Sequence, residues 1–383
     1  MNTSSLSTNR VQSVDLLRGL VLVLMAIDHV RVYSGVPAGG AEASVFFTRW
    51  ITHFCAPAFA FFAGTSAFLY GFKINNKSTL ARYLVTRGLL LVVLEITLIR
   101  FLWAFHINYS EFFLAGVIWM LGWCMVLLAA FIWLNPRMVG AIGLIIILIQ
   151  SVFSKVPYLL PTDSQFAFAK FWEFIYPSGF ESYEGVAVLY SIIPWIGVMA
   201  AGYGFGLVFT LSEDKIRKVC LAIGLTAVAL FIIIGSIAIV QQPNEDGIPF
   251  VFQLLNQRKY PASPLFLAMT LGPVIALVPW AEKATGWFAD VMKTFGRVPF
   301  FYYLLHILVI HLSALLVYLI LYGSVHHDWF LYAPYVFIEN EYRWTLPLLY
   351  LVFAIDVVIL FFICRWYARY KSGHPEKKWL KYV

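Results

Sequence analysis

The chain has 383 residues, of which 61% are hydrophobic and 12% are charged, and its formal net charge is +7. Soluble domains usually carry about 25% charged residues, so this chain has too few charges to cover a soluble globule of its length. The composition excludes an ordinary soluble protein and indicates a protein embedded in a membrane.

Ten apolar runs recur along the chain, most of them about 20 residues long, the length of helix that crosses the ~30 Å hydrocarbon core of a bilayer. In chain order they are residues 14–34, 46–72, 82–105, 112–134, 138–154, 187–211, 219–240, 263–281, 299–322 and 344–367. The first run is too long for a cleavable signal peptide, and Asp15 and Arg18 interrupt it. We therefore expect an all-α polytopic membrane protein of about ten transmembrane helices, forming one domain over residues 1–383 without a soluble domain.

The distribution of basic residues predicts the orientation of these spans. Most of the 27 lysines and arginines fall on the side of the predicted spans that holds the N-terminus. Loops rich in Lys and Arg stay in the cytoplasm, so both termini are predicted to be cytoplasmic and the chain to lie in the cytoplasmic membrane. No basic segment lies apart from the spans, which excludes nucleic acid as a partner.

The first two spans carry ionisable groups that a lipid-facing helix avoids, because a charge at mid-depth costs roughly 2.5–3.5 kcal/mol or more. Asp15, Arg18 and His29 fall within about 80° on one side of the first helix, and Asp15 lies about 21 Å from His29 along its axis. Such a stripe predicts a helix that lines a cleft across the membrane. The alternative is an Asp15–Arg18 pair at the headgroups and an interfacial histidine. His53 begins the second span on the side where His29 ends the first.

Several segments resemble one known family, in order and over nearly the whole chain. They are SVDLLRG (13–19), LMAIDH (24–29), RWITHFCAP (49–57), IPWIGVM (193–199), KYPAS (259–263) and GRVPFFYYLLH (296–306). They are similar to the bacterial branch of the heparan-alpha-glucosaminide N-acetyltransferase catalytic domain family. The resemblance implies a transmembrane acyltransferase that takes acetyl-CoA from the cytosol and acetylates a glucosamine-type sugar amine on the other side.

The chain departs from the family at one position. The lysosomal member is thought to use a histidine in the loop between the first two spans, and residues 36–47 contain none. Thioester aminolysis needs a base near pH 7, which a neutral histidine provides. We therefore predict His29 and His53 as catalytic residues, with Asp28, or alternatively Asp15, orienting a histidine. The alternative for His53 is a structural role at the start of a helix, bonded to backbone.

Coenzyme A carries phosphates, so its binding site requires cations. Arg18 and Arg297 each lie in a family-like motif at the start of a span. His306, in the same motif as Arg297, lies one turn above the cytoplasmic mouth of this site, where it contacts the pantetheine arm or bonds to a tyrosine between helices. The predicted cofactor-binding residues are Asp15, Arg18, Lys73, Arg297, Tyr302 and His306. The four cysteines fall in different spans, so they predict small buried side chains and no metal site.

Other polar residues and glycines within the spans leave further alternatives open. Glu95 and Arg100 are buried charges that pair across helices or form a proton pathway. Gly202 and Gly204 predict close helix packing rather than a nucleotide-binding loop. An O-acetyltransferase of an envelope glycan or lipid, and a secondary transporter, remain alternative functions. The predicted partners are acetyl-CoA, an amino sugar or glycan and the bilayer, with a homodimer left open.

Overall fold

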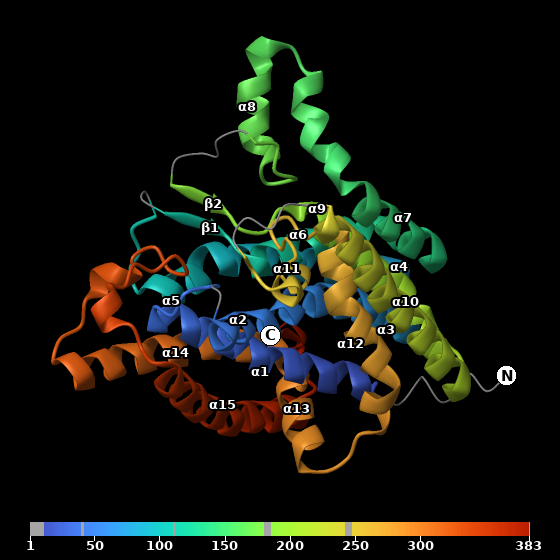
Figure 1. Cartoon of the computed structure of the whole chain (residues 1–383). Coiled ribbons are helices and arrows are strands. Elements are labelled where there is room, and N and C mark those ends of the chain that lie inside the picture. Colours follow the sequence, from blue (N-terminus) through green and yellow to red (C-terminus); the bar gives the residue numbers. More distant parts are fainter. Residues whose placement is uncertain (1–10, 40–41, 110–111, 180–184, 242–246, 383) are drawn as a thin grey trace.

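Helices form along almost every apolar run of the sequence. The computed structural model describes residues 11–39, 42–109, 112–179, 185–241 and 247–382 (Figure 1). The α-helices are α1 (Gln12–Ser34), α2 (Ala43–Trp50), α3 (Cys55–Ile74), α4 (Lys77–Leu94), α5 (Arg100–Ala104), α6 (Val117–Phe131), α7 (Pro136–Ile149), α8 (Thr162–Trp172), α9 (Ile192–Phe205), α10 (Glu213–Val240), α11 (Phe250–Leu255), α12 (Pro264–Lys283), α13 (Trp287–Arg297), α14 (Pro299–Tyr322) and α15 (Leu346–Gly373). A π-helix, η2 (Glu95–Ile99), joins α4 to α5. The 3₁₀-helices are η1 (Ile51–Phe54), η3 (Gln150–Leu159), η4 (Gly206–Thr210), η5 (His327–Phe330), η6 (Asn340–Tyr342) and η7 (Lys378–Lys381).

Within the described ranges, seven helical stretches are long and apolar enough to cross a membrane. They are Ala43–Ile74, Pro136–Leu159, Ile192–Thr210, Glu213–Val240, Pro264–Lys283, Pro299–Tyr322 and Leu346–Gly373. The other three predicted spans are also helical: α1, the stretch from α4 through η2 to α5, and the shorter α6. The first two carry several charged residues and α6 has 15 residues. The prediction of an all-α polytopic membrane protein is confirmed.

The structure differs from the predicted spans at two places where a short sheet replaces helix. Strand β1 (Phe113–Ala115) pairs in parallel with β2 (Val186–Val188), with Phe113 opposite Val186. The predicted spans 112–134 and 187–211 therefore begin as strand, and their helices start only at Val117 and Ile192. Pairing the two strands satisfies backbone groups that would be costly beside lipid. Helix α8, within a predicted loop, projects with η3 away from the other helices (Figure 1).

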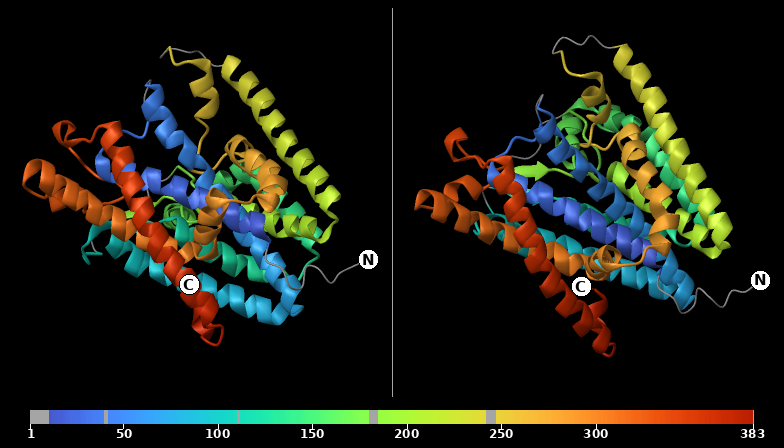
Figure 2. Two further views of the ribbon diagram at one scale, coloured as in Figure 1. Left: turned by 90° about the horizontal axis from the view of Figure 1, so that it is seen from below. Right: turned by 60° about the horizontal axis from the view of Figure 1, so that its bottom comes forward.

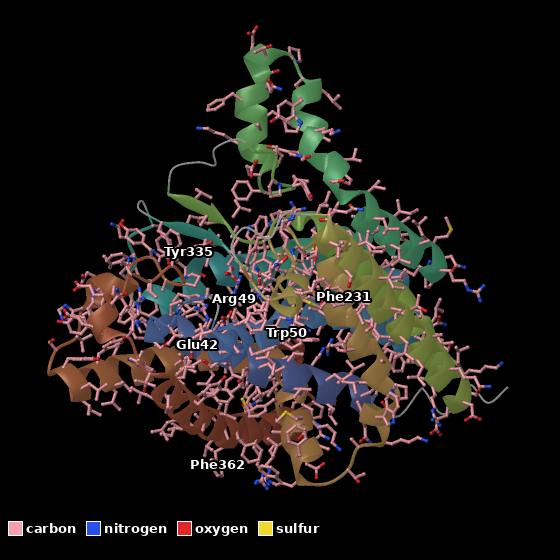
Figure 3. The ribbon with its side chains drawn as sticks, in the orientation of Figure 1. Glu42, Arg49, Trp50, Phe231, Tyr335 and Phe362 are labelled. Atoms are coloured by element: carbon pink, nitrogen blue, oxygen red, sulfur yellow. The ribbon has the colours of Figure 1, made fainter. Side chains whose placement is uncertain are left out.

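Helix α1 runs through the middle of the molecule, where it contacts α3, α12, α13, α14 and α15. In both views of Figure 2, α10 and α15 lie on opposite sides of it. These outer helices expose apolar side chains such as Ile233 and Phe362, and Phe362 lies at the rim in Figure 3. Because neighbouring helices cover α1 on several sides, they shield its ionisable groups from lipid.

Glycines set the closest approaches between helices, as predicted for Gly202 and Gly204 on α9. A Cβ atom at Gly202 would lie 2.0 Å from the Phe61 carbonyl oxygen on α3, and one at Gly204 would lie 2.6 Å from Cα of Gly140 on α7. Distances this short leave no room for a side chain. The prediction of close helix packing is confirmed, and α9 is held between α3 and α7.

We expect Gly202→Ala to lower the melting temperature of the purified protein. The added methyl group would force α9 away from Phe61, and overpacking of this kind costs roughly 1–3 kcal/mol of stability. Gly373→Ala is the matched control, because nothing lies within 4 Å of a Cβ atom placed there. Equal melting temperatures for the two variants would contradict the tight contact between α9 and α3.

Candidate active site

A cavity of about 700 Å³ lies at the end of α1 that carries His29, and we name it the His29 cavity. Its charged lining comes from segments that are far apart in the sequence: Asp28, His29 and Arg31 on α1, Arg49 on α2, Glu95 on η2, Lys259 before α12, and Glu339 and Arg343 beside η6. The volume falls within the usual range for small-molecule sites, about 300–1,000 Å³. The fold therefore gathers acids, bases and a histidine around a space large enough for a sugar.

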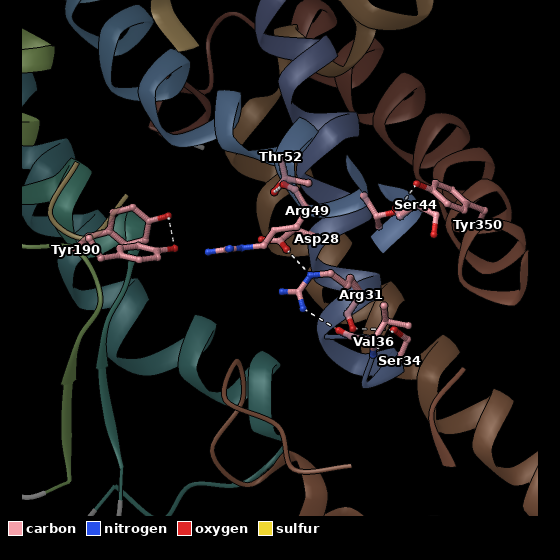
Figure 4. Close-up of polar contacts among 11 residues, drawn as sticks. Asp28, Arg31, Ser34, Val36, Ser44, Arg49, Thr52, Tyr190 and Tyr350 are labelled. Carbon is pink, nitrogen blue, oxygen red and sulfur yellow. Dashed lines mark hydrogen bonds and ion pairs between the residues drawn. The ribbon is translucent and has the colours of Figure 1, made fainter. Parts of the chain in front are cut away.

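Asp28 is held in place on the wall of this cavity. The Arg31 guanidinium donates Nε–H to Asp28 Oδ1 over 2.9 Å and Nη1–H to the Val36 carbonyl oxygen over 3.0 Å (Figure 4). Burial alone would lower the pKa of the Lys259 ammonium group, but the adjacent Tyr260 hydroxyl and the Asp28 carboxylate raise that pKa above its ordinary value. Lys259 therefore stays charged at neutral pH, close to an acid that Arg31 orients.

Glu95 reaches the cavity from the π-helix η2. Its carboxylate Oε2 accepts a hydrogen bond of 3.1 Å from the Ile118 backbone N–H, in the first turn of α6. Gly116 makes room for this contact, since a Cβ atom there would lie 2.1 Å from Glu95 Oε1. Arg100 instead donates to the Phe112 carbonyl oxygen over 3.2 Å. The Glu95 and Arg100 side chains are therefore both hydrogen-bonded to backbone groups.

Two histidines from helices distant in the sequence meet beside this cavity. His29 Nδ1 lies 2.7 Å from His306 Nε2, and His306 Nδ1 lies 3.1 Å from the Tyr302 carbonyl oxygen. His306 is fully buried on α14, and the Trp103 ring packs edge-on against His29 with ring centroids 4.7 Å apart. The His29 ring is thereby fixed on one side by Trp103 and on another by His306.

The hydrogen bonds assign the protons of this histidine pair. A carbonyl oxygen only accepts, so in neutral His306 the proton is on Nδ1 and is donated to Tyr302. His306 Nε2 then carries a lone pair and accepts the Nδ1–H of His29. A neutral imidazole has one N–H, so Nε2 is the basic nitrogen of His29. His29 is therefore held in the tautomer that leaves Nε2 free to accept a proton.

A second cavity, of about 340 Å³, lies nearer the Asp15 end of α1, and we name it the Arg18 cavity. Basic side chains from four helices line it: Arg18, Arg87, Arg297 and Lys371. Arg18 donates Nη2–H to the Phe62 carbonyl oxygen over 2.5 Å and to Ser66 Oγ over 2.6 Å. The remaining wall is largely aliphatic and aromatic, so the cavity combines cations with an apolar interior.

The His29 and Arg18 cavities adjoin, because Tyr303 and Val117 line both of them. Tyr303 lies against His306, with ring centroids 5.2 Å apart. A ligand that extends from the Arg18 cavity past Tyr303 would arrive beside the His29–His306 pair. Of the predicted polar stripe on α1, Arg18 and His29 each line one of these cavities, whereas Asp15 lines neither.

His53 lines a third, smaller cavity of about 270 Å³, which we name the His53 chamber. The chamber adjoins the His29 cavity, because Ala38 and Arg49 line both. The His53 ring packs edge-on against Phe266, with ring centroids 5.4 Å apart. The histidine that contacts His29 is thus His306, while His53 faces a separate space. A catalytic role for His53 stays a prediction.

The predicted cofactor-binding residues are spread over several environments. Arg18 and Arg297 line the Arg18 cavity, whereas Lys73 is exposed outside its lining. Tyr302 is fully buried, with its ring stacked on His306 at 5.3 Å. Asp15 is buried at the crossing of α1 and α13, where a Cβ atom on Gly296 would lie 1.8 Å from the Asp15 carbonyl oxygen.

Sequence reasoning missed several residues that line these cavities. Tyr303 is one residue beyond the predicted Tyr302, and Lys371 lies in the last turn of α15, beyond the predicted span 344–367, where the sequence gave no reason to single it out. Arg49 and Lys259 stood inside the family-like motifs, which was the available signal for both.

The fold and the site define a polytopic helical membrane protein whose central helix connects a cation-lined cavity to a cavity with a base. The model of the family described as heparan-alpha-glucosaminide N-acetyltransferase, catalytic, matches residues 10–243. The chain belongs to this family and is a transmembrane acetyltransferase. No curated protein matches the chain. His306 and Arg297 lie outside the matched residues, so the family match does not bear on the role predicted for either.

Proposed function

We propose that this protein transfers an acetyl group from acetyl-CoA in the Arg18 cavity to the amino group of a glucosamine-type sugar in the His29 cavity. The observation that carries the proposal is that the two cavities share Tyr303 and Val117 beside the His29–His306 pair. One cavity suits the donor and the other suits the acceptor. Reaction at their junction would move the acetyl group across most of the membrane without moving coenzyme A.

The Arg18 cavity has the chemistry that coenzyme A requires. The phosphates of this donor are best matched by guanidinium and ammonium groups, which Arg18, Arg87, Arg297 and Lys371 supply. Leu22, on the same face of α1 as Arg18, is among the apolar wall residues that would pack against the pantetheine arm. The thioester would then lie near Tyr303, at the end closest to His29.

His29 would act as the general base of a direct transfer. The amine nitrogen of the sugar attacks the thioester carbonyl carbon while His29 Nε2 accepts a proton from that nitrogen. The C–S bond then breaks, the amide remains on the sugar, and the coenzyme A thiolate takes up the proton from His29. His306 accepts the Nδ1–H of His29 throughout, and so keeps Nε2 aimed at the cavity.

Reconstitution in sealed vesicles tests this proposal. With acetyl-CoA supplied on one side only and glucosamine on the other, we expect N-acetylglucosamine to form on the glucosamine side. Acetyl-CoA binding to the purified protein should weaken as salt rises, because phosphate contacts are partly screened. Uptake of glucosamine without acetylation would instead identify a secondary transporter, and acetylation of a hydroxyl alone would identify an O-acetyltransferase.

A further inference from the structure

Glu95 is a buried carboxylate that the steps of acetyl transfer described above leave without a task. It is 2% exposed, and it lines the His29 cavity from the π-helix η2. Single π-helical turns within α-helical segments are frequent at functional sites. An ionisable side chain that lines a cavity inside a membrane protein is also rare and usually functional. Both observations indicate that Glu95 acts on a ligand.

The carboxylate of Glu95 lies where the His29 and Arg18 cavities adjoin. Its Oε2 accepts the backbone N–H of Ile118, which lines the Arg18 cavity, and the preceding residue, Val117, lines both cavities. Its Oε1 lies beside Gly116, which lines the His29 cavity, since a Cβ atom on Gly116 would be 2.1 Å from Oε1. The carboxylate is therefore the part of Glu95 that lies among the lining residues, at the place where donor and acceptor would meet.

Glu95 differs from the other carboxylates of the His29 cavity in its surroundings. The cavity is also lined by Asp28, which is paired with Arg31, and by Glu339, which is exposed. The ion pairs found within the described ranges include none of Glu95. Buried charges in proteins are normally paired with an opposite charge, so the site of Glu95 fits a cationic group that a ligand supplies.

The chemistry of an amine acceptor requires a second base at the same place. Near pH 7 an amino group is largely protonated, and an ammonium nitrogen has no lone pair with which to attack. It must lose one proton before the attack and a second proton as the amide forms. His29 accepts only one of these two protons. A hydroxyl acceptor, in contrast, has one proton to lose.

We propose that Glu95 binds the amino group of the acceptor as an ammonium ion and accepts its first proton, and thereby selects amines over hydroxyls. The inference rests on the proposed function for the reaction itself, and it names the group that determines the acceptor class. The ammonium donates an N–H to Oε1 and transfers that proton to the carboxylate. The neutral amine then attacks the thioester carbon while His29 takes the second proton.

The protons balance over one turnover. The C–S bond breaks as the C–N bond forms, and the coenzyme A thiolate takes up the proton held by His29. Glu95 gives its own proton to water in the His29 cavity and is again a carboxylate. One ammonium and one thioester thus yield one amide, one thiol and one released proton.

Calorimetric binding to the purified full-length protein, without acetyl-CoA, tests this assignment independently of catalysis. The probes are glucosamine and glucose, which has a hydroxyl in place of the amino group. We expect glucosamine to bind about tenfold more tightly, as hydrogen bonds between charged groups allow. Glu95→Gln can still accept the Ile118 N–H but is uncharged, and it should abolish most of the preference. Glu95→Asp, which keeps the charge, should retain part of it.

The matched control is Glu341→Gln, because Glu341 is exposed on η6 and lies outside the lining of the His29 cavity. It should keep the full preference for glucosamine. Equal binding of the two sugars by the unaltered protein would overturn the assignment even if a Glu95 variant did not fold. A preference that Glu95→Gln leaves intact would overturn it as well. The vesicle assay separates this failure from that of the proposed function, because acetyl transfer to glucosamine is measured there without reference to the binding preference.

Discussion

Replacing His29 by Gln is expected to lower kcat for acetyl transfer by about 10²–10⁴-fold, the contribution that a positioned general base makes. Gln keeps a polar side chain of similar size on the wall of the His29 cavity, but it has no basic nitrogen. Since His29 is only partly buried, the melting temperature should change little. Initial rates with acetyl-CoA and glucosamine, measured beside thermal unfolding of the same preparation, separate a loss of chemistry from a loss of fold.

His327→Gln is the matched control, because His327 is exposed on η5 and lines none of the three cavities. It should have the rate of the unaltered protein. His53→Gln should lower kcat much less than His29→Gln, because His53 lines a different cavity from His29. Full turnover by His29→Gln together with a large loss in His53→Gln would place the base in the His53 chamber, where the sequence also allowed it.

Some features of the site could be predicted from the sequence because they depend on one helix only. The period of 3.6 residues places Arg18 and His29 on one side of α1, and the structure has Arg18 on one cavity and His29 on the next. The apolar runs likewise predicted every long helix, since length and hydropathy alone decide whether a helix can cross a bilayer. No other segment had to be positioned for these inferences.

The remaining features depend on how helices pack, which a single sequence does not reveal. Tyr302 and Tyr303 differ by 100° of rotation around α14, and packing alone decides that Tyr303 faces both cavities while Tyr302 is buried. Glu95 reaches the His29 cavity from a π-helix, where the α-helical period no longer applies. The contact of His29 with His306 joins residues 277 positions apart.

In the proposed reaction, the contact of His29 with His306 fixes the tautomer of the base. Without an acceptor at Nδ1, the proton of a neutral imidazole can occupy either nitrogen, and the ring can turn. In serine proteases, a change that leaves the catalytic histidine in the wrong tautomer lowers kcat by about 10⁴-fold. In the proposed reaction, His306 would do for His29 what the buried carboxylate does there, although it is uncharged and accepts the hydrogen bond through its own Nε2. His306 would then be a positioning residue that acts through His29.

We expect His306→Leu to lower kcat by roughly 10²-fold or more, because Leu fills the buried space but cannot accept the Nδ1–H of His29. His306→Gln should restore much of the rate, since its side-chain carbonyl oxygen can accept the same hydrogen bond. KM for both substrates should stay close to the original value in each variant. A merely structural His306 would not give this pattern, because Leu is at least as compatible as Gln with a site that is 0% exposed. If the two variants lose equal activity, or if Leu retains more than Gln, His306 does not orient His29, and a different group must fix the tautomer of the base.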